Sequence, residues 1–308
     1  MTTYLFGRVG RIVLQVLIIL SAVFFLFRIA PGDPALLILG PNAGQDQIDL
    51  LRQELGLNLP VWQQYVDYLS AAVAGDLGES LSYSQPAVVI VLQHVKATVV
   101  LLVSSLSIAV TLGMSAGVMS ALMPRSMPAR MSLFLWVILL AIPNFWLGML
   151  LVQVFAVNLG WLPAIGSSGL ALVLPAFSIA ARLVALIARL TRATMLEVVG
   201  EDFVRAARAR GVSPIRLVFH HILRPALPPV LILIGLQAGY LLGGSVVIEN
   251  LFSYPGMGSL LLVAVGARDF ALVQAITIFY VVGFLFINLL VDVVSSRLDP
   301  RIRLAGTT

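Results

Sequence analysis

The sequence predicts an all-α membrane protein with six transmembrane helices. Of its 308 residues, 60% are hydrophobic and only 11% are charged, whereas soluble domains carry about 25% charged residues. The mean hydropathy is +1.02. A soluble chain of this length cannot hide so much apolar surface, because many of its residues must face water. The charges are also clustered and leave long uncharged windows, which is typical of a chain that crosses a bilayer several times.

Several windows have the length and apolarity of membrane-spanning helices, each of which needs about 20 apolar residues. These windows are residues 12–27, 97–123, 131–181, about 226–248 and about 270–291. The uncharged run 131–181 is too long for one crossing and is interrupted by NLGWLPAIGSSG, residues 158–169. Because this interruption is rich in glycine and proline, the run is predicted to form two helices joined by a short loop.

The first window is predicted to remain in the protein as a membrane anchor. Arg11 and Arg28 flank it, and their long side chains can reach the two interfaces. A cleaved signal peptide has small residues before its cleavage site, where this chain has Arg28 and Ile29. Six crossings then place both termini on the same side of the membrane.

The distribution of arginine predicts which side faces the cytoplasm, because loops rich in basic residues stay there. One set of loops holds the polar segment 201–225 and further arginines: Arg8, Arg11, Arg125, Arg130, Arg297, Arg301 and Arg303. The loop at residues 29–96 instead carries most of the acidic residues. We therefore expect cytoplasmic termini, residues 1–28 as a tip and first helix, and residues 29–96 as an outer loop. Residues 97–308 are expected to form a five-helix core with a cytoplasmic loop at about residues 191–225.

Two short amphipathic helices are predicted in the outer loop. DQIDLLRQELG, residues 46–56, has apolar residues at helical spacing and ends on a glycine. PVWQQYVDYLSAAV, residues 60–73, begins with proline at a first helical position. Its apolar stripe consists of Trp62, Tyr65, Val66 and Leu69. The two helices are interpreted either as a cap over the membrane helices or as a docking surface for an external partner.

Small and polar residues mark two further features of the membrane helices. Small residues repeat every four positions on the second and fifth helices, at Ala109, Gly113, Gly117 and Ala121 and at Gly235, Gly239 and Gly243. Such stripes let helix backbones approach closely in lipid and are predicted to be packing contacts. Asn144, Gln237 and Tyr240 are polar side chains within apolar helices, so they are candidates for a translocation path.

The segment EDFVRAARARGVSPIRLVFHHILRP, residues 201–225, is named the elbow below and is the polar exception in the core. Glu201 and Asp202 favour the N-terminus of a first helix, and Arg208 and Arg210 favour its C-terminus, because these charges oppose the helix dipole at each end. Gly211 can take the left-handed conformation that ends a helix. Ser213 then fits as N-cap, and Pro214 fits as the first residue of a second helix.

The second elbow helix is predicted at residues 215–224, where Pro225 stops it or bends it into the fifth membrane helix. On the first elbow helix, Phe203, Ala206 and Ala207 are predicted to share a face that leaves room for another backbone. A basic amphipathic pair can also lie on anionic lipid headgroups. The capped corner favours a protein socket, because a lipid-binding helix needs no fixed turn.

The elbow resembles the coupling loop of ATP-binding cassette (ABC) importer permeases, whose pattern is Glu-Ala-Ala, three residues, then Gly. Ala206, Ala207 and Gly211 match this spacing, and Arg205 stands in place of the glutamate. Other stretches resemble the dipeptide, oligopeptide and nickel permease family along the whole chain, and the outer loop resembles its B-type member. These are APGDPA (30–35), LGLNLPVWQQY (55–65), GDLGESLSYSQPAV (75–88), IPNFWLG (142–148), GWLPAIG (160–166), ENLFSYPGMG (249–258) and DPRIR (299–303).

The resemblance implies the type I ABC importer permease fold in a bacterial inner membrane. It implies that this chain forms half of a channel, beside a second homologous permease, two ABC ATPase domains or subunits and an external binding protein. No G-x-x-x-x-G-K-[ST] loop is present, so ATP and magnesium are expected on the ATPase partners, with no cofactor and no enzymatic activity in this chain. Contact with the ATPase is expected at Ala206, Ala207, Arg208, Gly211, Val212, Ser213, Pro214 and Arg216.

The cargo stays open between dipeptides, longer peptides, nickel and haem. Arg182 lies on the same side of the fourth helix as Arg189 and about two turns deeper, where it either faces the path or pairs with Asp292. His220 and His221 point about 100° apart on one helix and His94 is expected on the other membrane face, so they form no common metal site. A rival class, an ion-coupled carrier, is disfavoured because few buried carboxylates are available for ion coupling.

Overall fold

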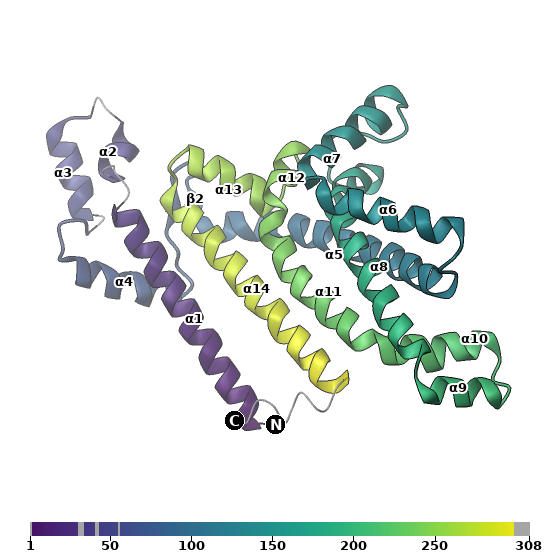
Figure 1. The fold of residues 1–308 in the computed structure, drawn as a ribbon. Helices are drawn as coiled ribbons and strands as arrows, with labels where there is room; N and C mark the ends of the chain where they lie inside the picture. Colours follow the sequence, from purple (N-terminus) through teal and green to yellow (C-terminus); the bar gives the residue numbers. More distant parts are fainter. Residues whose placement is uncertain (1, 30–33, 41–42, 55, 299–308) are drawn as a thin grey trace. The chain divides into compact units, whose positions relative to one another are not determined.

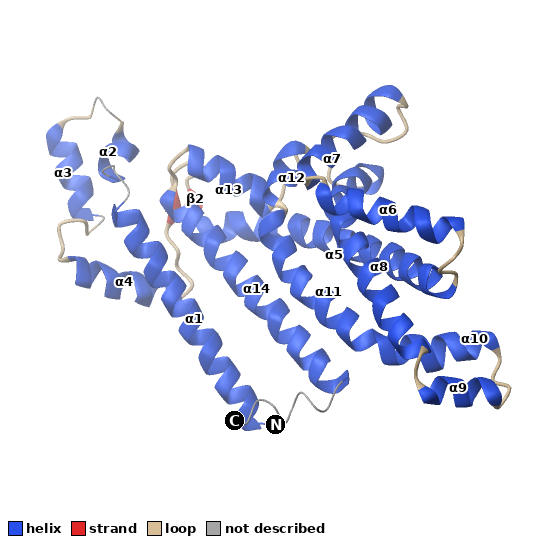
Figure 2. Ribbon diagram, viewed as in Figure 1, coloured by secondary structure: helices blue, strands red, loops and turns tan. Residues whose placement is uncertain are grey.

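The structure is a computed structural model that describes residues 2–29, 34–40, 43–54 and 56–298. Almost all of these residues are helical (Figures 1 and 2). The chain divides into two compact units, which are described separately. Unit 1 combines Met1–Lys96 with Leu260–Val282, and unit 2 combines Ala97–Ser259 with Gly283–Thr308.

Unit 1 begins with four helices and a two-stranded hairpin. Its elements are α1 (Thr2–Ile29), α2 (Pro34–Leu39), α3 (Gln45–Glu54), α4 (Val61–Val73), β1 (Glu79–Ser80), β2 (Gln85–Pro86), and parts of α5 (Ala87–Leu122), α13 (Met257–Gly266) and α14 (Phe270–Leu298). An aromatic cluster joins α1 to α4: the ring of Phe24 lies 5.3 Å from that of Tyr65 and 5.4 Å from that of Tyr68. The hydroxyls of Ser21 and Tyr65 are 2.6 Å apart.

Both short helices predicted in the outer loop are present, as α3 and α4. Gly56 has φ +65° after α3, as the left-handed helix end requires. The predicted stripe on α4 is divided, because Tyr65 packs on α1 while Trp62 and Val66 are 65% and 54% exposed. Gln64 is instead buried and donates to the carbonyls of Leu57 and Leu59. The aromatic and hydroxyl groups of α1 decide which face of α4 is covered, and the sequence of α4 alone does not contain them.

Asp269 fixes the β1–β2 hairpin to the start of α14. Its Oδ1 accepts from the N–H of Leu272 at 3.1 Å, as an N-cap residue does. Its Oδ2 accepts from the hydroxyl of Ser80 at 2.5 Å and from the N–H of Ser82 at 3.0 Å. Asp269 and Ser80 are both buried. The carboxylate therefore serves as a helix cap and as the anchor of the hairpin at once.

This anchor is expected to fail in acid. Burial of Asp269 alone would raise its pKa, but hydrogen bonds from Ser80, Ser82 and Leu272 lower the pKa overall, below the ordinary value of 3.8. A lowered folded-state pKa gives stability that is full above the unfolded pKa and is lost as pH falls through the folded pKa. The protection factors of the amides in residues 79–86, which correct exchange for its intrinsic pH dependence, should thus fall only below about pH 4. Asp269→Asn should lower them at neutral pH as well, and unchanged protection factors in that variant would contradict the anchor.

Unit 2 is built around α8, the helix with the largest share of buried residues among the candidate spans, at 67%. The unit contains the rest of α5, α6 (Met127–Ala141), α7 (Asn144–Leu151), a π-helical segment Val152–Asn158, a 3₁₀ turn Gly169–Leu172, α8 (Val173–Val199), α9 (Asp202–Ala209), α10 (Pro214–Arg216), a π-helical segment Leu217–Leu223, α11 (Arg224–Gly244), α12 (Val246–Leu251) and the second half of α14. Helices α6, α7 and α11 pack directly against α8.

Four helical stretches are long and apolar enough to cross a membrane: Ala87–Leu122, Gly169–Val199, Pro214–Gly244 and Phe270–Val291. A bent pair, Met127–Ala141 with Asn144–Asn158, would add a fifth. The prediction of one uninterrupted helix before residue 158 is wrong, because the chain turns by 110° between α6 and α7. Pro143 explains the break, since proline disfavours helical geometry at the preceding Ile142, which is extended here. Helix α1 contributes a shorter apolar stretch, Val13–Leu26.

The small-residue stripe on α5 is a packing contact, as predicted. A Cβ atom added at Gly117 would lie 2.6 Å from the Cβ of Thr191 and 2.7 Å from the carbonyl oxygen of Ala188. One at Gly113 would lie 2.8 Å from the Cβ of Ile187. Glycine therefore lets α5 approach the backbone of α8.

The stripe on α11 is a packing contact at only two of its three glycines. A Cβ at Gly235 would collide with Val291 of α14, and one at Gly239 would lie 2.7 Å from the ring of Phe284. A Cβ at Gly243 would have no neighbour within 4 Å among the described residues. Glycine therefore recurs at every fourth position over a longer stretch of α11 than the part that contacts α14.

Candidate functional site

The first elbow helix is α9, with Glu201 at its N-cap position and Arg210 at its C-cap position. Asp202 stands in the first turn and forms an ion pair with Arg205 at 2.7 Å. Both side chains are largely exposed, so this pair adds little stability. The residues that begin and end this helix are those predicted from its charges.

The two alanines of α9 have different surroundings. Ala207 and Val204 are each 1% exposed and pack with Met195, Leu217, Ile222 and Ala226. Ala206 faces outward, as does Phe203, which is 45% exposed. The prediction that all three of Phe203, Ala206 and Ala207 share an outer face is therefore wrong for Ala207. Adjacent positions on a helix point about 100° apart, and the cluster below α9 takes the Ala207 side.

The turn after α9 is closed by the backbone hydrogen bonds of a Schellman motif. The N–H of Val212 donates to the carbonyl of Ala207, and the N–H of Gly211 donates to the carbonyl of Arg208. Gly211 has φ +77°, the left-handed conformation predicted from the sequence. The elbow therefore has a fixed corner.

The second elbow helix begins as predicted but does not end at Pro225. Ser213 occupies the N-cap position without a side-chain cap bond, and Pro214 follows as the first helical residue. The helix then continues from Pro214 to Gly244 through the π-helical segment Leu217–Leu223. The prediction of a stop or separate bend at Pro225 is thus corrected. The wider π turn just before Pro225 accommodates a residue that lacks the N–H of a normal α turn.

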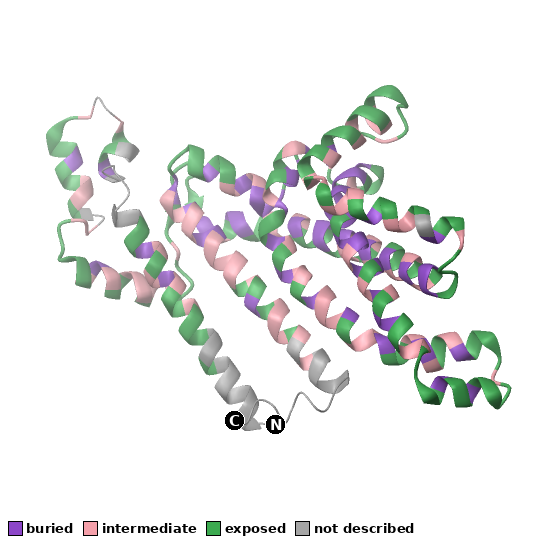
Figure 3. Ribbon diagram, in the orientation of Figure 1, coloured by how far each residue is buried: buried purple, intermediate pink, exposed green. Residues whose placement is uncertain are grey.

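The outer surface of the elbow combines apolar side chains with arginines. Ile215 is 75% exposed, Phe219 is 60% exposed and Phe203 is 45% exposed. Arg205, Arg208, Arg210 and Arg216 are also exposed, and Figure 3 shows most of α9 in the colour of exposed residues. In Figure 1, α9 and α10 lie side by side beyond the ends of α8 and α11. Large exposed apolar residues beside fixed charges are typical of a protein contact surface.

The elbow also covers a hollow of about 390 Å³. Its wall consists of apolar residues from α5, α8 and the second elbow helix, together with Val212, Pro214 and Arg208. Val212 and Pro214 therefore border this hollow, Arg208 is exposed at its edge, and Ile215 and Phe219 lie outside it.

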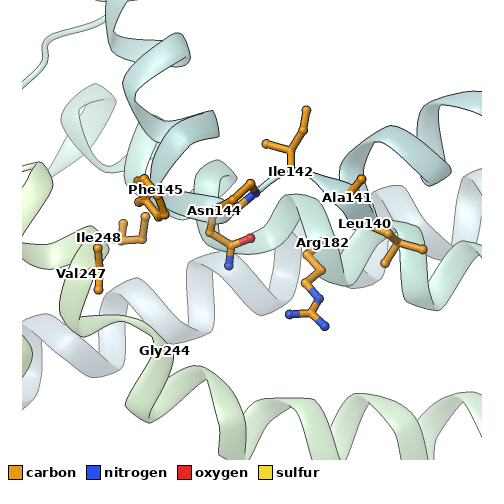
Figure 4. A pocket seen from close by; sticks show the side chains of 10 residues that line it. Leu140, Ala141, Ile142, Asn144, Phe145, Arg182, Gly244, Val247 and Ile248 are labelled. Atoms are coloured by element: carbon orange, nitrogen blue, oxygen red, sulfur yellow. The ribbon is translucent and has the colours of Figure 1, made fainter.

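A second candidate site is a pocket of about 370 Å³ in unit 2 that contains Asn144 and Arg182. Asn144 lies at the start of α7, and Arg182 lies on α8; the ends of α6 and α11 and the start of α12 complete the wall. Figure 4 shows both polar side chains directed to the same side, over Gly244. The structure therefore brings two of the four predicted path residues together.

The other two predicted path residues, Gln237 and Tyr240, do not line this pocket. Tyr240 is 70% exposed and Gln237 is partly buried. The side chain of Asp292, the alternative partner predicted for Arg182, lies outside the described residues. His220 and His221 lie next to each other, with ring centroids 6.2 Å apart and tilted by 70°.

A buried carboxylate that the sequence analysis did not single out organises the ENLFSYPGMG segment. Glu249 is 0% exposed. Its Oε1 accepts from the hydroxyls of Thr98 at 3.1 Å and Ser245 at 3.0 Å. Its Oε2 accepts from the N–H groups of Gly258 at 2.6 Å and Ser259 at 3.2 Å. A glutamate followed by P-G-x-G was the available signal, because glycines allow a backbone to approach a carboxylate closely.

Comparison with known proteins places the chain in one class, the permeases of ABC importers. Residues 109–304 match the family described as the inner membrane component of binding-protein-dependent transport systems, and residues 1–113 match its N-terminal part. The chain belongs to this family of multi-pass membrane proteins.

The relatives include the glutathione transport system permease protein GsiC of Escherichia coli, strains CFT073 and K12. Each is 41% identical over 304 residues, which cover 98% of this chain and 99% of the relative. Among solved structures, a chain of the inward-facing MetNI methionine ABC transporter has a TM-score of 0.57 at 20% identity, over 68% of this chain and 96% of that chain. A chain of an amino acid ABC transporter with histidines has a TM-score of 0.53 at 18% identity, over 68% and 94%.

Proposed function

We propose that this chain forms half of the translocation path of an ATP-driven importer for peptides. A second, homologous permease forms the other half, two ABC ATPase domains or subunits drive it, and an extracytoplasmic binding protein delivers the cargo. The chain crosses the inner membrane six times, with α1 as the first span and both termini in the cytoplasm. It binds no cofactor and catalyses no reaction, because ATP and magnesium bind to its partners.

The elbow is the observation that carries this proposal. Its Schellman turn fixes the angle between α9 and the second elbow helix. Its second helix continues without interruption into α11. A force applied to the exposed surface around Phe203, Ile215 and Phe219 is therefore transmitted along a rigid element to a membrane helix. ATP-driven closure of the ATPases would move the elbows of both permeases, and the membrane helices would alternate between inward-open and outward-open states.

The cargo is proposed to be a peptide of the size of glutathione, a tripeptide. The full-length relatives named as glutathione permeases support a peptide-like cargo. The pocket supports it independently, since Arg182 and Asn144 supply donors for the carboxylate and amide groups of a peptide. Nickel and haem are the alternative cargoes within the same family, and an ion-coupled carrier is the alternative class.

Reconstitution tests the proposal directly. The chain, its second permease, the ATPases and the binding protein are assembled in proteoliposomes, and uptake of labelled glutathione and trialanine is measured. We expect uptake to require ATP and the binding protein, to stop with vanadate, and to persist when an ionophore collapses the ion gradients. Uptake that follows an ion gradient without ATP would contradict the importer and favour the carrier.

A further inference from the structure

Arg182 is the charged residue among the described residues that line the pocket of Asn144 and Arg182. It is exposed to the pocket, although it belongs to a membrane helix, where a cation is costly. Among the residues that the structure describes, its guanidinium makes no hydrogen bond or ion pair. Its neighbours on α8, Ala181 and Leu183, are buried, so the helix that carries the arginine is held in place. A fixed cation without a protein partner is available to a ligand.

The remaining lining restricts what that ligand can be. Asn144 adds an amide with two N–H donors and one acceptor. None of the described residues that line the pocket is acidic or carries a metal-binding side chain, and the rest of the wall is apolar. The volume of about 370 Å³ lies at the small end of the range for ligand sites, which is about 300–1,000 Å³. The pocket thus suits one anionic end group of a small molecule.

A carboxylate fits this set of donors best. The planar guanidinium can donate two parallel hydrogen bonds to the two oxygens of a carboxylate. The amide of Asn144, directed to the same side in Figure 4, can hydrogen-bond the adjacent peptide group. The side chains of Ile142, Phe145 and Val247 form an apolar border around these donors, and Phe145 and Val247 are 46% and 56% exposed, so a ligand can reach the site from solvent.

We propose that the pocket between α6, α7, α8 and α12 binds the C-terminal carboxylate of a peptide in transit, with Arg182 as its charged partner and Asn144 as its hydrogen-bonding partner. This inference rests on the proposed function as a peptide importer. It assigns to the permease a selection step of its own, which follows selection by the binding protein. A peptide whose carboxylate is blocked leaves the guanidinium without a partner and is expected to pass more slowly.

The test compares peptides that differ only at the C-terminal group. Trialanine and glutathione, each as the free acid and as the C-terminal amide, are imported by proteoliposomes that contain the complete transporter. The ratio of acid to amide uptake is measured for the unmodified chain and for Arg182→Gln. Any preference of the binding protein is the same in every sample, so it cancels when the ratios are compared.

Arg189→Gln provides the matched control. Arg189 is exposed on the same side of α8, seven residues further along, and does not line the pocket. We expect Arg182→Gln to lower the acid-to-amide ratio about tenfold, the effect of losing a hydrogen bond to a charged group. Arg182→Lys keeps the charge without the planar fork and should lower the ratio less. Asn144→Ala should lower the uptake of acid and amide alike, because the peptide group that it contacts is present in both, and Arg189→Gln should leave the ratio unchanged.

Three outcomes overturn the proposal. Unchanged uptake of both acid and amide in Arg182→Gln, with normal import by the unmodified chain, would contradict the pocket and leave the importer intact. An equal fall for acid and amide in this variant would show that Arg182 has only a structural role. If the unmodified transporter hydrolyses ATP but imports neither peptide, the proposed peptide cargo fails, and the carboxylate site fails with it.

Discussion

Glu249→Ala is expected to destabilise the folded chain by about 2–6 kcal/mol, because two backbone N–H groups lose a buried acceptor at about 1–3 kcal/mol each. The carboxylate accepts four hydrogen bonds, which match the acceptor sites of its two oxygens. Without it, the N–H groups of Gly258 and Ser259 lose their acceptor, and each unsatisfied buried group costs about 1–3 kcal/mol. The hydroxyl of Ser245 can still donate to the carbonyl of Leu242 at 3.1 Å. Thr98 keeps one contact, because its hydroxyl oxygen also accepts from the N–H of Met257 at 2.8 Å.

Two further variants separate hydrogen bonding from volume. Glu249→Gln keeps the size of the side chain, but its NH₂ group then faces groups that donated hydrogen bonds to the carboxylate, so this variant should also destabilise the chain. Gly258→Ala should do the same by sterics, because a Cβ there would lie 2.6 Å from the backbone Cα of Val246. Gly243→Ala is the control, since its Cβ would meet nothing within 4 Å among the described residues.

The unfolding midpoint of the purified chain in detergent, followed by tryptophan fluorescence, measures these effects. The chain contains four tryptophans and no cysteine, so this intrinsic signal is available where a thiol-reactive dye would not report. We expect large downward shifts for Glu249→Ala, Glu249→Gln and Gly258→Ala and a small shift for Gly243→Ala. A midpoint for Glu249→Ala as high as that of the control would refute the role of the carboxylate.

Gly211→Val is expected to reduce ATP-driven import at least tenfold while leaving the chain in the membrane. Gly211 has a φ of +77°, a left-handed backbone conformation that glycine adopts freely. Holding a β-branched residue in this conformation costs about 1–3 kcal/mol of strain. Apart from its two chain neighbours, no described residue has an atom within 4 Å of the position that a Cβ would take, so the effect comes from the backbone conformation. The strain is relieved by opening the Schellman turn, which changes the angle of the corner that is proposed to engage the ATPase.

Two controls distinguish a lost corner from a general disturbance of the elbow. Gly211→Asn should retain most import, because asparagine tolerates the left-handed conformation. Gly200→Ala changes an exposed glycine at the other end of α9 whose φ is −74°, and it should import normally. Import and ATP hydrolysis are measured together in proteoliposomes. Normal import per ATP hydrolysed by Gly211→Val would show that the corner plays no part in coupling.

The local features of the elbow could be predicted because each depends on residues within one or two helical turns. Charges at its ends placed α9, Gly211 placed the turn, and Pro214 placed the second helix. The predicted stop or bend at Pro225 was wrong because a π-helical segment precedes the proline. The sequence of Leu217–Leu223 contains no residue that predicts a π-helix. The division between Ala206 and Ala207 also escaped prediction, since it depends on the cluster beneath α9.

The path residues were predicted only as a set of candidates. Apolar helices made Asn144, Arg182, Gln237 and Tyr240 conspicuous, but polarity alone does not show which of them share a space. The break at Pro143 turns α7 and carries Asn144 to the pocket that Arg182 enters from α8. The bend between α6 and α7 therefore decides the membership of this site.

The sequence by itself determined the membrane-embedded helical class, the positions of most apolar helices and the capped corner, because composition, apolar runs and caps act over short distances along the chain. Only the tertiary structure decided which polar groups meet. Ser80 and Asp269 are 189 residues apart in the chain, and Thr98 and Glu249 are 151 apart. A buried carboxylate is stable only with its donors in place, and the packing of distant helices supplies those donors.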